Sequence, residues 1–211
     1  MPFNVLVLGI AEENEYGNIQ LTSGQVMNGL TDFSFDNMRV EPVYFEGQLP
    51  GSGLRAGEYG VAAAHRSAWH ECANSGADAC VIMERDAVLV SDHHEVFSDM
   101  NNVVTGVSNG SADIGFLGHC HGLCTHGYVL KPSSALELIN KLPSEENMTQ
   151  PVDFTTLEYC NDKGERCIFA PCASFANDDE LDNTTAAKDW GHGCMRQDRS
   201  NDKFENTVSS S

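Results

Sequence analysis

Short apolar runs alternate with longer amphipathic segments along the chain, and each kind has the length of one type of element. Residues 4–8 and 79–83 are almost entirely apolar, as is typical of short strands that are covered on both faces. Residues 58–75 are rich in Ala and free of Pro, and Gly76 follows where a helix would end. This pattern predicts strand, helix and strand in that order, with one buried helix face formed by Val61, Ala64, Ala68 and Cys72.

Further elements follow from the same patterns. They are strands at 40–45, 113–117, 128–130 and 167–170, and helices at 20–30 and 133–142. Strands and helices interleave throughout, which is typical of an α/β fold with a mostly parallel sheet between helices. Because no repeat or low-complexity linker interrupts the chain, we predict a single domain over residues 1–211. The polar residues from 178 onward are predicted to lie on its surface.

The negative charge of the chain argues against some classes of binding partner. It has 12 basic and 31 acidic residues, a formal net charge of −19. Binding to nucleic acid or to an anionic membrane surface needs clustered Lys and Arg, so neither partner is expected. No apolar run approaches the roughly 20 residues of a membrane-spanning helix. A small phosphorylated ligand is still compatible with this charge, provided that a cation or backbone N–H groups meet its phosphates.

The cysteines suggest two different environments. Eight cysteines could indicate a secreted protein held by disulfides, but the chain does not open with a basic and then apolar export segment. We therefore expect mostly buried, reduced thiols and a cytoplasmic location.

The strongest local signal for chemistry is the stretch Met83-Glu84-Arg85-Asp86. In an extended segment, residues two apart point the same way, so Glu84 and Asp86 can converge on one point. Carboxylates that converge at the carboxyl end of a strand favour a hard divalent cation, Mg²⁺ or Mn²⁺, which could meet a diphosphate. The alternative is an ordinary solvated end of a strand.

A second cluster contains His119, Cys120, His121, Cys124 and His126. Five Cys and His side chains within eight residues could supply the ligands of a zinc ion, but structural zinc sites draw paired ligands from two separated segments. Only Cys160 and Cys167 could supply the second pair, so zinc is the less favoured interpretation. No dinucleotide-binding, P-loop or nucleophile-elbow motif is present in the sequence.

Four stretches, in order, resemble the signature of family 25 glycosyltransferases, which include lipopolysaccharide-modifying enzymes and collagen galactosyltransferases. They span residues 57–153, roughly half of the chain. They are Gly57-Glu58-Tyr59-Gly60 with Ala64-His65 and Trp69, then Val81-Ile82-Met83-Glu84-Arg85-Asp86-Ala87, then Cys124-Thr125-His126-Gly127-Tyr128-Val129-Leu130, and last Pro151-Val152-Asp153.

The chain departs from that signature in three places. Arg85 replaces the middle acid of the family's acidic triplet, and Val61 and Ala64 replace its usual Cys and Ser. The chain is also short for the family. Its length and its opening residues further resemble the capsid-glycan glycosyltransferase domains of chlorella-infecting large DNA viruses, which implies a viral protein in the host cytoplasm. This resemblance leaves open that the chain is part of a larger polypeptide.

The resemblance implies a GT-A-type fold and a metal-dependent glycosyltransferase that uses a UDP-sugar. Residues 1–100 would form the nucleotide-sugar half, residues 101–180 the acceptor half and residues 181–211 a tail. Glu84, Asp86 and His192 would bind Mn²⁺ or Mg²⁺. Residues implied to contact the donor are Leu8, Gly9, Ala11, Glu12, Arg55, Glu58, His65, Arg66, Glu84, Arg85 and Asp86.

The reaction implied for this family is inverting. An acceptor hydroxyl attacks the anomeric carbon opposite the leaving diphosphate, which requires a base on the acceptor side. Asp153 is the predicted base, with Asp178 and Asp179 as alternatives, and Asp153 could instead be the N-cap of a helix. Two other functions remain open, namely a metal-dependent phosphohydrolase and a non-catalytic module that binds carbohydrate or metal.

Overall fold

The structure is a computed structural model. It describes residues 2–8, 34–40, 54, 56–84, 87–89, 94–120, 123–142, 149–171, 192–193 and 195–197. The elements are β1 (Pro2–Leu8), β2 (Ser34–Val40), α2 (Ala56–Asn74), β3 (Ala79–Glu84), β4 (Ala87–Leu89), α3 (His94–Ser108), β5 (Ile114–Cys120), β6 (Leu123–Leu130), α4 (Pro132–Lys141), α5 (Val152–Lys163), the 3-10 turn η2 (Gly164–Arg166), β7 (Cys167–Phe169), β8 (His192–Gly193) and β9 (Met195–Gln197).

Most of the described strands form one mixed sheet. Its order is β2-β1-β3-β6-β5-β7, and β8 pairs with β5. Strands β1, β2, β3, β5 and β7 run in the same direction, while β6 runs against its neighbours β3 and β5. The sequence prediction of an α/β fold with a sheet flanked by helices is therefore confirmed, but the sheet is mixed rather than mostly parallel: three of its described pairings are parallel and three are antiparallel. Strands β4 and β9 form a separate pair.

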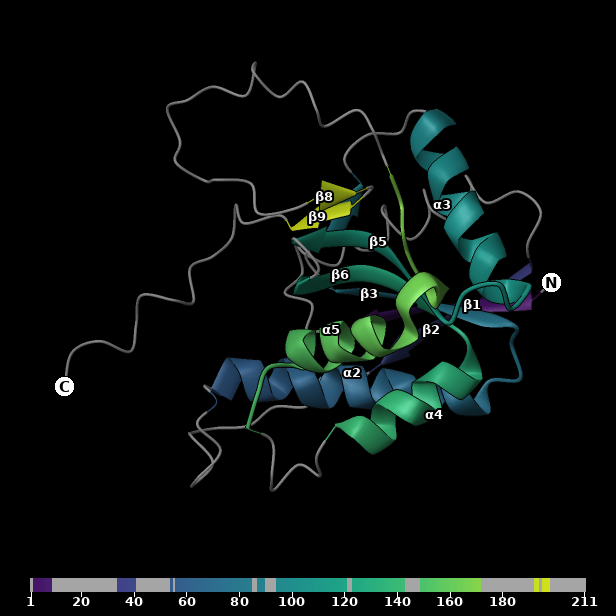
Figure 1. Cartoon of the computed structure of the whole chain (residues 1–211). Helices are drawn as coiled ribbons and strands as arrows, with labels where there is room; N and C mark the ends of the chain where they lie inside the picture. Colours follow the sequence, from purple (N-terminus) through teal and green to yellow (C-terminus); the bar gives the residue numbers. More distant parts are fainter. Residues whose placement is uncertain are drawn as a thin grey trace, which may run out of the picture.

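Helices cover both faces of this sheet. In Figure 1, α2, α4 and α5 lie on one side of it and α3 lies on the other. Alternate side chains of β3 enter the two cores, since Cys80 and Ile82 pack toward α2, α4 and α5, whereas Val81 and Met83 pack toward α3. This double cover explains why β3 is a continuous apolar run. By the same alternation Glu84 follows Ile82 onto the side of α2 and α5.

The parallel strands end together at one edge of the sheet. Leu8 is paired with Val40 in β2 and with Glu84 in β3, so these three strands reach the same edge at their carboxyl ends. Helix α2 runs back along β3, because Cys72 near its end is bonded to Cys80 near the start of β3 while His65 contacts Glu84. The helix thus brings a side chain from its middle to the carboxyl edge of the sheet.

Several predicted elements are confirmed closely. The helix predicted at 58–75 is α2, and Gly76 after it has φ of 69°, the left-handed conformation that glycine adopts without strain. The helix predicted at 133–142 is α4, and the strands predicted at 4–8, 79–83, 113–117 and 167–170 are β1, β3, β5 and β7. The predicted helix at 20–30 lies outside the described residues.

Other predictions need correction. The second strand was expected at 40–45, and the described strand β2 runs from Ser34 to Val40 beside β1, so it begins earlier than expected; residues 41–45 lie outside the described part. Strand β6 begins at Leu123 rather than 128, because it pairs along β3 and β5. The polar tail contributes β8 and β9 to sheets. Val61, expected on one face with Ala64, Ala68 and Cys72, is 44% exposed, whereas Tyr59, Ala62 and Ala63 of the same part of α2 are buried, so Val61 lies on the solvent side of the helix.

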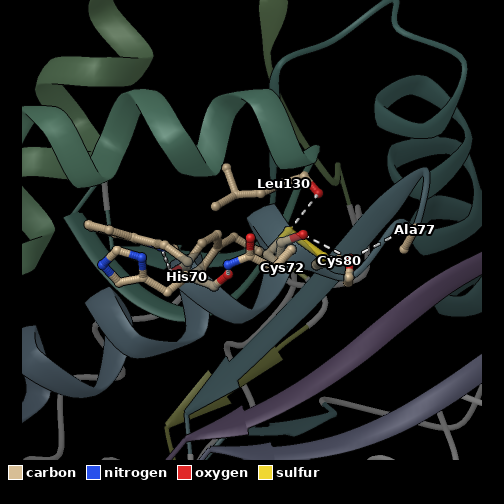
Figure 2. The surroundings of a disulfide bond; sticks show 9 residues. His70, Cys72, Ala77, Cys80 and Leu130 are labelled. Atoms are coloured by element: carbon tan, nitrogen blue, oxygen red, sulfur yellow. Dashed lines mark hydrogen bonds between the residues drawn. A yellow bond between two sulfur atoms is a disulfide. The ribbon is translucent and has the colours of Figure 1, made fainter.

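The expectation of reduced thiols is wrong for every cysteine whose side chain the structure describes. Cys72 is bonded to Cys80, as Figure 2 shows, and Cys160 is bonded to Cys167. Their Cα atoms are 5.9 and 5.2 Å apart, within the range of disulfides. Each pair joins a helix to the strand that follows it, because a short connection folds the strand back along the helix. The cysteines therefore give no support to a cytoplasmic location.

Candidate functional site

The carboxylate of Glu84 is the centre of a polar cluster at the carboxyl end of β3. Its Oε1 atom accepts a hydrogen bond from Thr125 Oγ1 and lies 3.1 Å from His65 Nε2. Its Oε2 atom is 3.6 Å from His126 Nδ1. The side chain is 18% exposed, whereas His65 is fully buried and His126 nearly so. Glu84 is thus held by buried polar side chains on its inner side and is partly open to solvent.

Thr125 links Glu84 to the predicted base. Its hydroxyl oxygen lies 2.9 Å from Asp153 Oδ1 as well as within hydrogen-bond distance of Glu84 Oε1. The hydroxyl has a single hydrogen and can donate it to only one of the two carboxyl groups at a time. The arrangement is satisfied when the other carboxyl group is protonated and donates to Thr125. Glu84 and Asp153 therefore share one hydroxyl partner and favour one negative charge between them.

The pKa values of the two acids are shifted in opposite directions. Burial by itself raises the pKa of Glu84, but contacts from His126 and His65 outweigh burial and hold this pKa well below its usual value. Burial raises the pKa of Asp153, and the negative charge of Glu84 raises it further. The cluster thus keeps Glu84 ionised and makes Asp153 the stronger base. Opposed pKa shifts of two neighbouring acids are a common property of active sites.

Local structure explains how these residues come together. His65 lies in the middle of α2, Glu84 ends β3, and Thr125 and His126 lie in β6, the antiparallel neighbour of β3. Asp153 is the second residue of α5, whose N-cap is Pro151. The alternative of Asp153 as an N-cap is therefore wrong, since the proline takes that position and Asp153 lies in the first turn, where negative charge is favourable.

The other described residues predicted to contact the donor lie in different positions. The backbone of Leu8 pairs with Glu84 at the same edge of the sheet. Glu58 lies in the first turn of α2. Arg66 donates a hydrogen bond from Nη1 to the backbone oxygen of Leu142, 3.2 Å away, and so ties α2 to the end of α4. His65 is fully buried and lies 3.1 Å from Glu84, so it contacts the proposed metal ligand from the core side.

Part of the predicted site cannot be placed. Gly9, Ala11, Glu12, Arg55, Arg85 and Asp86 lie outside the described residues, as do the alternative bases Asp178 and Asp179. For His192 only the backbone is described, and it pairs with the backbone of His119 near the carboxyl end of β5. Since β5 runs parallel to β3, this pairing brings the tail to the edge of the sheet where Glu84 lies.

The described residues leave the Mn²⁺ or Mg²⁺ site a prediction and remove one basis for the zinc interpretation. Among the described residues no group of three or more Cys, His, Asp and Glu side chains is arranged to hold a metal ion. The zinc interpretation cannot draw on Cys160 and Cys167, because these two are bonded to each other. Glu84 itself fits a hard divalent cation, since its carboxylate is held ionised and is partly exposed. The remaining predicted ligands, Asp86 and the imidazole of His192, belong to the part of the site that is not described.

Two residues of the cluster had no role in the sequence-based prediction. Thr125 bridges the two acids, and Tyr128 contacts His65 Nδ1 at 2.7 Å. Both belong to the stretch that resembles Thr-His-Ala-Tyr of family 25, so the signal was present in the sequence. Alternation along a strand would separate Thr125 from Tyr128, but the register of β6 against β5 shifts between them.

No protein-family model and no curated protein matches this chain. In the described part of the chain, no helix combines the length and apolar character needed to span a membrane. The function is therefore inferred from the site.

Proposed function

We propose that this chain is a metal-dependent glycosyltransferase of GT-A type, which transfers a sugar from a UDP-sugar to a saccharide or glycoprotein acceptor with inversion. One observation carries the proposal. The four stretches that resemble family 25 each contribute a residue to one cluster. Thr125 contacts both Glu84 and Asp153, and Glu84 contacts His65. Four stretches that matched by chance would have no reason to meet at one point.

The position of the cluster also supports the proposal. Open α/β sheets bind their ligands at the carboxyl ends of the parallel strands, and Glu84 lies at that edge beside the end of β1. The three neighbouring parallel strands β2, β1 and β3 are also what a Rossmann-like nucleotide-sugar half requires. In the proposed arrangement the loop after Leu8 binds the nucleoside, and α5 presents Asp153 from the acceptor side.

Asp153 has the properties of the base in an inverting transfer. The acceptor oxygen forms a bond to the anomeric carbon, the bond from that carbon to the diphosphate oxygen breaks, and Asp153 takes the acceptor proton. Burial and the charge of Glu84 raise the pKa of Asp153, which brings it closer to the pH at which it must take a proton. Thr125 holds the carboxyl group in place through Oδ1, 2.9 Å away.

Glu84 would be one ligand of the divalent cation, with Asp86 and His192 as the others predicted. When bound, Mn²⁺ or Mg²⁺ would act as a Lewis acid that stabilises the negative charge of the departing UDP. The surrounding residues keep Glu84 ionised, because contacts from His126 and His65 lower its pKa. Thr125 donates a hydrogen bond to the same carboxylate. This arrangement also reconciles the net charge of −19 with a phosphorylated ligand.

Thermal denaturation with nucleotides tests the proposal. Melting temperatures are measured with UDP, GDP, CDP and a free sugar, each with and without Mn²⁺. A ligand at 100 times its Kd stabilises the fold by about 2.7 kcal/mol, or about 5–11 °C for a chain of this size. Stabilisation by UDP that requires Mn²⁺ supports the transferase. Phosphate release from a simple ester supports the phosphohydrolase instead, and stabilisation by a sugar alone supports a binding module.

Variants then distinguish the proposed metal ligands, Glu84 and Asp86, from the proposed base, Asp153. Glu84→Gln and Asp86→Ala should remove the Mn²⁺-dependent shift produced by UDP. Asp153→Asn should keep the shift and lose sugar transfer from a UDP-sugar. The matched control for Glu84→Gln is Glu137→Gln, since Glu137 is a half-exposed glutamate on α4 that pairs with Lys163. An unchanged UDP shift in Glu84→Gln would remove Glu84 from the metal site, and retained transfer in Asp153→Asn would exclude it as the base.

A further inference from the structure

Three fully buried polar side chains lie behind Glu84, and the proposed reaction uses only one of them, His65, through its contact with Glu84. They are His65 and Trp69 on α2 and Tyr128 on β6. Trp69 Nε1 donates to the Tyr128 hydroxyl at 2.8 Å, and that hydroxyl lies 2.7 Å from His65 Nδ1. The other ring nitrogen of His65, Nε2, is 3.1 Å from Glu84 Oε1. The three side chains thus form a continuous line of hydrogen bonds from the core to the carboxylate.

The direction of each hydrogen bond in this line follows from the chemistry of the groups. The indole N–H of Trp69 can only donate, so the oxygen of Tyr128 is the acceptor there. Tyr128 then has one hydrogen left, and burial raises the pKa of this phenol well above its usual value, so the hydrogen stays in place. Among the described residues the acceptor within reach of that hydrogen is His65 Nδ1. A nitrogen that accepts a hydrogen bond carries no proton, so the proton of neutral His65 is on Nε2.

We propose that Trp69 and Tyr128 are positioning residues that fix His65 in the Nε2–H tautomer, and that His65 in turn fixes the orientation of Glu84. With this tautomer the N–H of His65 points at Glu84 Oε1, which also accepts from Thr125. Two donors on one oxygen set the plane of the carboxylate and therefore the place of Oε2. With the other tautomer a bare Nε2 would face the carboxylate, and its donor would be the Thr125 hydroxyl, 3.3 Å away, whose single hydrogen would then be lost to Glu84.

Packing holds the line in one arrangement. His65 and Trp69 are four residues apart on α2 and so lie on the same helix face. The rings of His65 and Tyr128 are stacked, with an angle of 16° between their planes and 5.6 Å between their centroids. Phe116 packs against the same tyrosine at 6.1 Å between centroids. This packing keeps the rings of His65 and Tyr128 in place, while the hydrogen bonds from Tyr128 and to Glu84 select the tautomer.

The tautomer can be measured without a substrate. In protein labelled with ¹⁵N-histidine, at a fixed neutral pH, two-dimensional spectra that connect ring nitrogens to ring protons distinguish a protonated nitrogen from a bare one. His65→Gln identifies the resonances of His65. We expect a bare Nδ1 and a protonated Nε2 in the unaltered chain. A protonated Nδ1 would overturn the inference, whatever the function of the chain proves to be.

Two variants test the line itself. Tyr128→Phe keeps the ring and removes the hydroxyl, so we expect His65 to lose the pure Nε2–H signature. Trp69→Phe removes only the hydrogen bond from the indole N–H to Tyr128 and should change the His65 spectrum less. It replaces Tyr128→Phe as the test if that variant does not fold. The control is Phe116→Leu, which alters packing around the same tyrosine and should leave the tautomer unchanged. An unchanged tautomer in both Tyr128→Phe and Trp69→Phe would overturn the inference.

The consequence for catalysis depends on the proposed function. Loss of a group that orients a ligand or catalytic residue typically costs 10–100-fold in binding or activity. We expect Tyr128→Phe to lower kcat/KM for sugar transfer by about that factor, and Phe116→Leu to lower it far less. If no transfer is detected in the unaltered chain, the proposed function fails while the spectra still decide the tautomer. If transfer is detected and Tyr128→Phe has the activity of the unaltered chain, the positioning role is wrong.

Discussion

Replacing Asp153 by asparagine should stabilise the folded chain at neutral pH while it removes the proposed base. Thr125 Oγ1 lies 2.5 Å from Glu84 Oε1 and 2.9 Å from Asp153 Oδ1, so these two oxygens are at most about 5.4 Å apart. Two unit negative charges at that distance repel each other by about 3 kcal/mol at an effective dielectric constant of about 20. The nearby histidines and the hydrogen bond from Thr125 offset part of this repulsion. We therefore expect Asp153→Asn to gain about 1–2 kcal/mol.

The asparagine also completes the local hydrogen bonds. Its amide N–H can donate to Thr125, which then donates to Glu84, so no carboxylate competes for the single hydroxyl hydrogen. For a chain of this size, a gain of 1–2 kcal/mol raises Tm by about 2–8 °C. The assay is thermal denaturation followed by circular dichroism, with sugar transfer measured on the same preparations. The matched control, Asp162→Asn, changes an exposed aspartate on the same helix that pairs with Lys141, and should change stability by less than about 0.5 kcal/mol.

The dependence on pH gives this prediction a second test. The pKa of Asp153 is raised in the folded chain above its usual 3.8, so the folded state binds this proton more tightly than the unfolded state. The stability that the proton contributes is fully present below pH 3.8 and is lost as pH rises through the raised pKa. The difference in Tm between Asp153→Asn and the unaltered chain should therefore shrink as the solution is acidified. A lower Tm for Asp153→Asn at neutral pH, or a difference that does not change with pH, would refute the reasoning.

Three predictions concern the stability of the sheet. The contact with Arg166 holds the pKa of Asp113 well below its usual value, so Asp113→Asn should lower the free energy of unfolding by about 3 kcal/mol at neutral pH and by progressively less in acid below pH 3.8; equal losses at every pH would contradict this. Changing Cys72 and Cys80 together to alanine should lower the free energy of unfolding in urea by about 2–3 kcal/mol, as expected for a short closed loop, whereas no change would show that the disulfide does not stabilise the chain. Gly115→Ala would bring a Cβ atom to 2.3 Å from a methyl group of α3 and should cost about 1–3 kcal/mol in the same urea titration; a neutral result would mean that α3 moves freely.

Much of the fold could be predicted because it follows from local patterns. The run 79–83 is apolar throughout since helices cover both faces of β3, and the Ala-rich segment before it has no residue that would break a helix. Helix α3 was missed although its buried residues Val96, Met100, Val103 and Val107 recur at helical spacing. The sequence therefore carries a clear signal for this helix.

The sequence by itself determined that Glu84 would lie at the carboxyl end of a buried strand, because strand length and alternation depend on neighbouring residues alone. Only the tertiary structure decided what surrounds it. Thr125 and Asp153 are 41 and 69 residues away from Glu84 along the chain, and no spacing rule indicates that one hydroxyl would join the two acids. The partners of the cysteines were decided in the same way, by how each strand folds back on its helix. Local periodicity specifies which way a side chain points, whereas the packing of distant elements specifies what it meets.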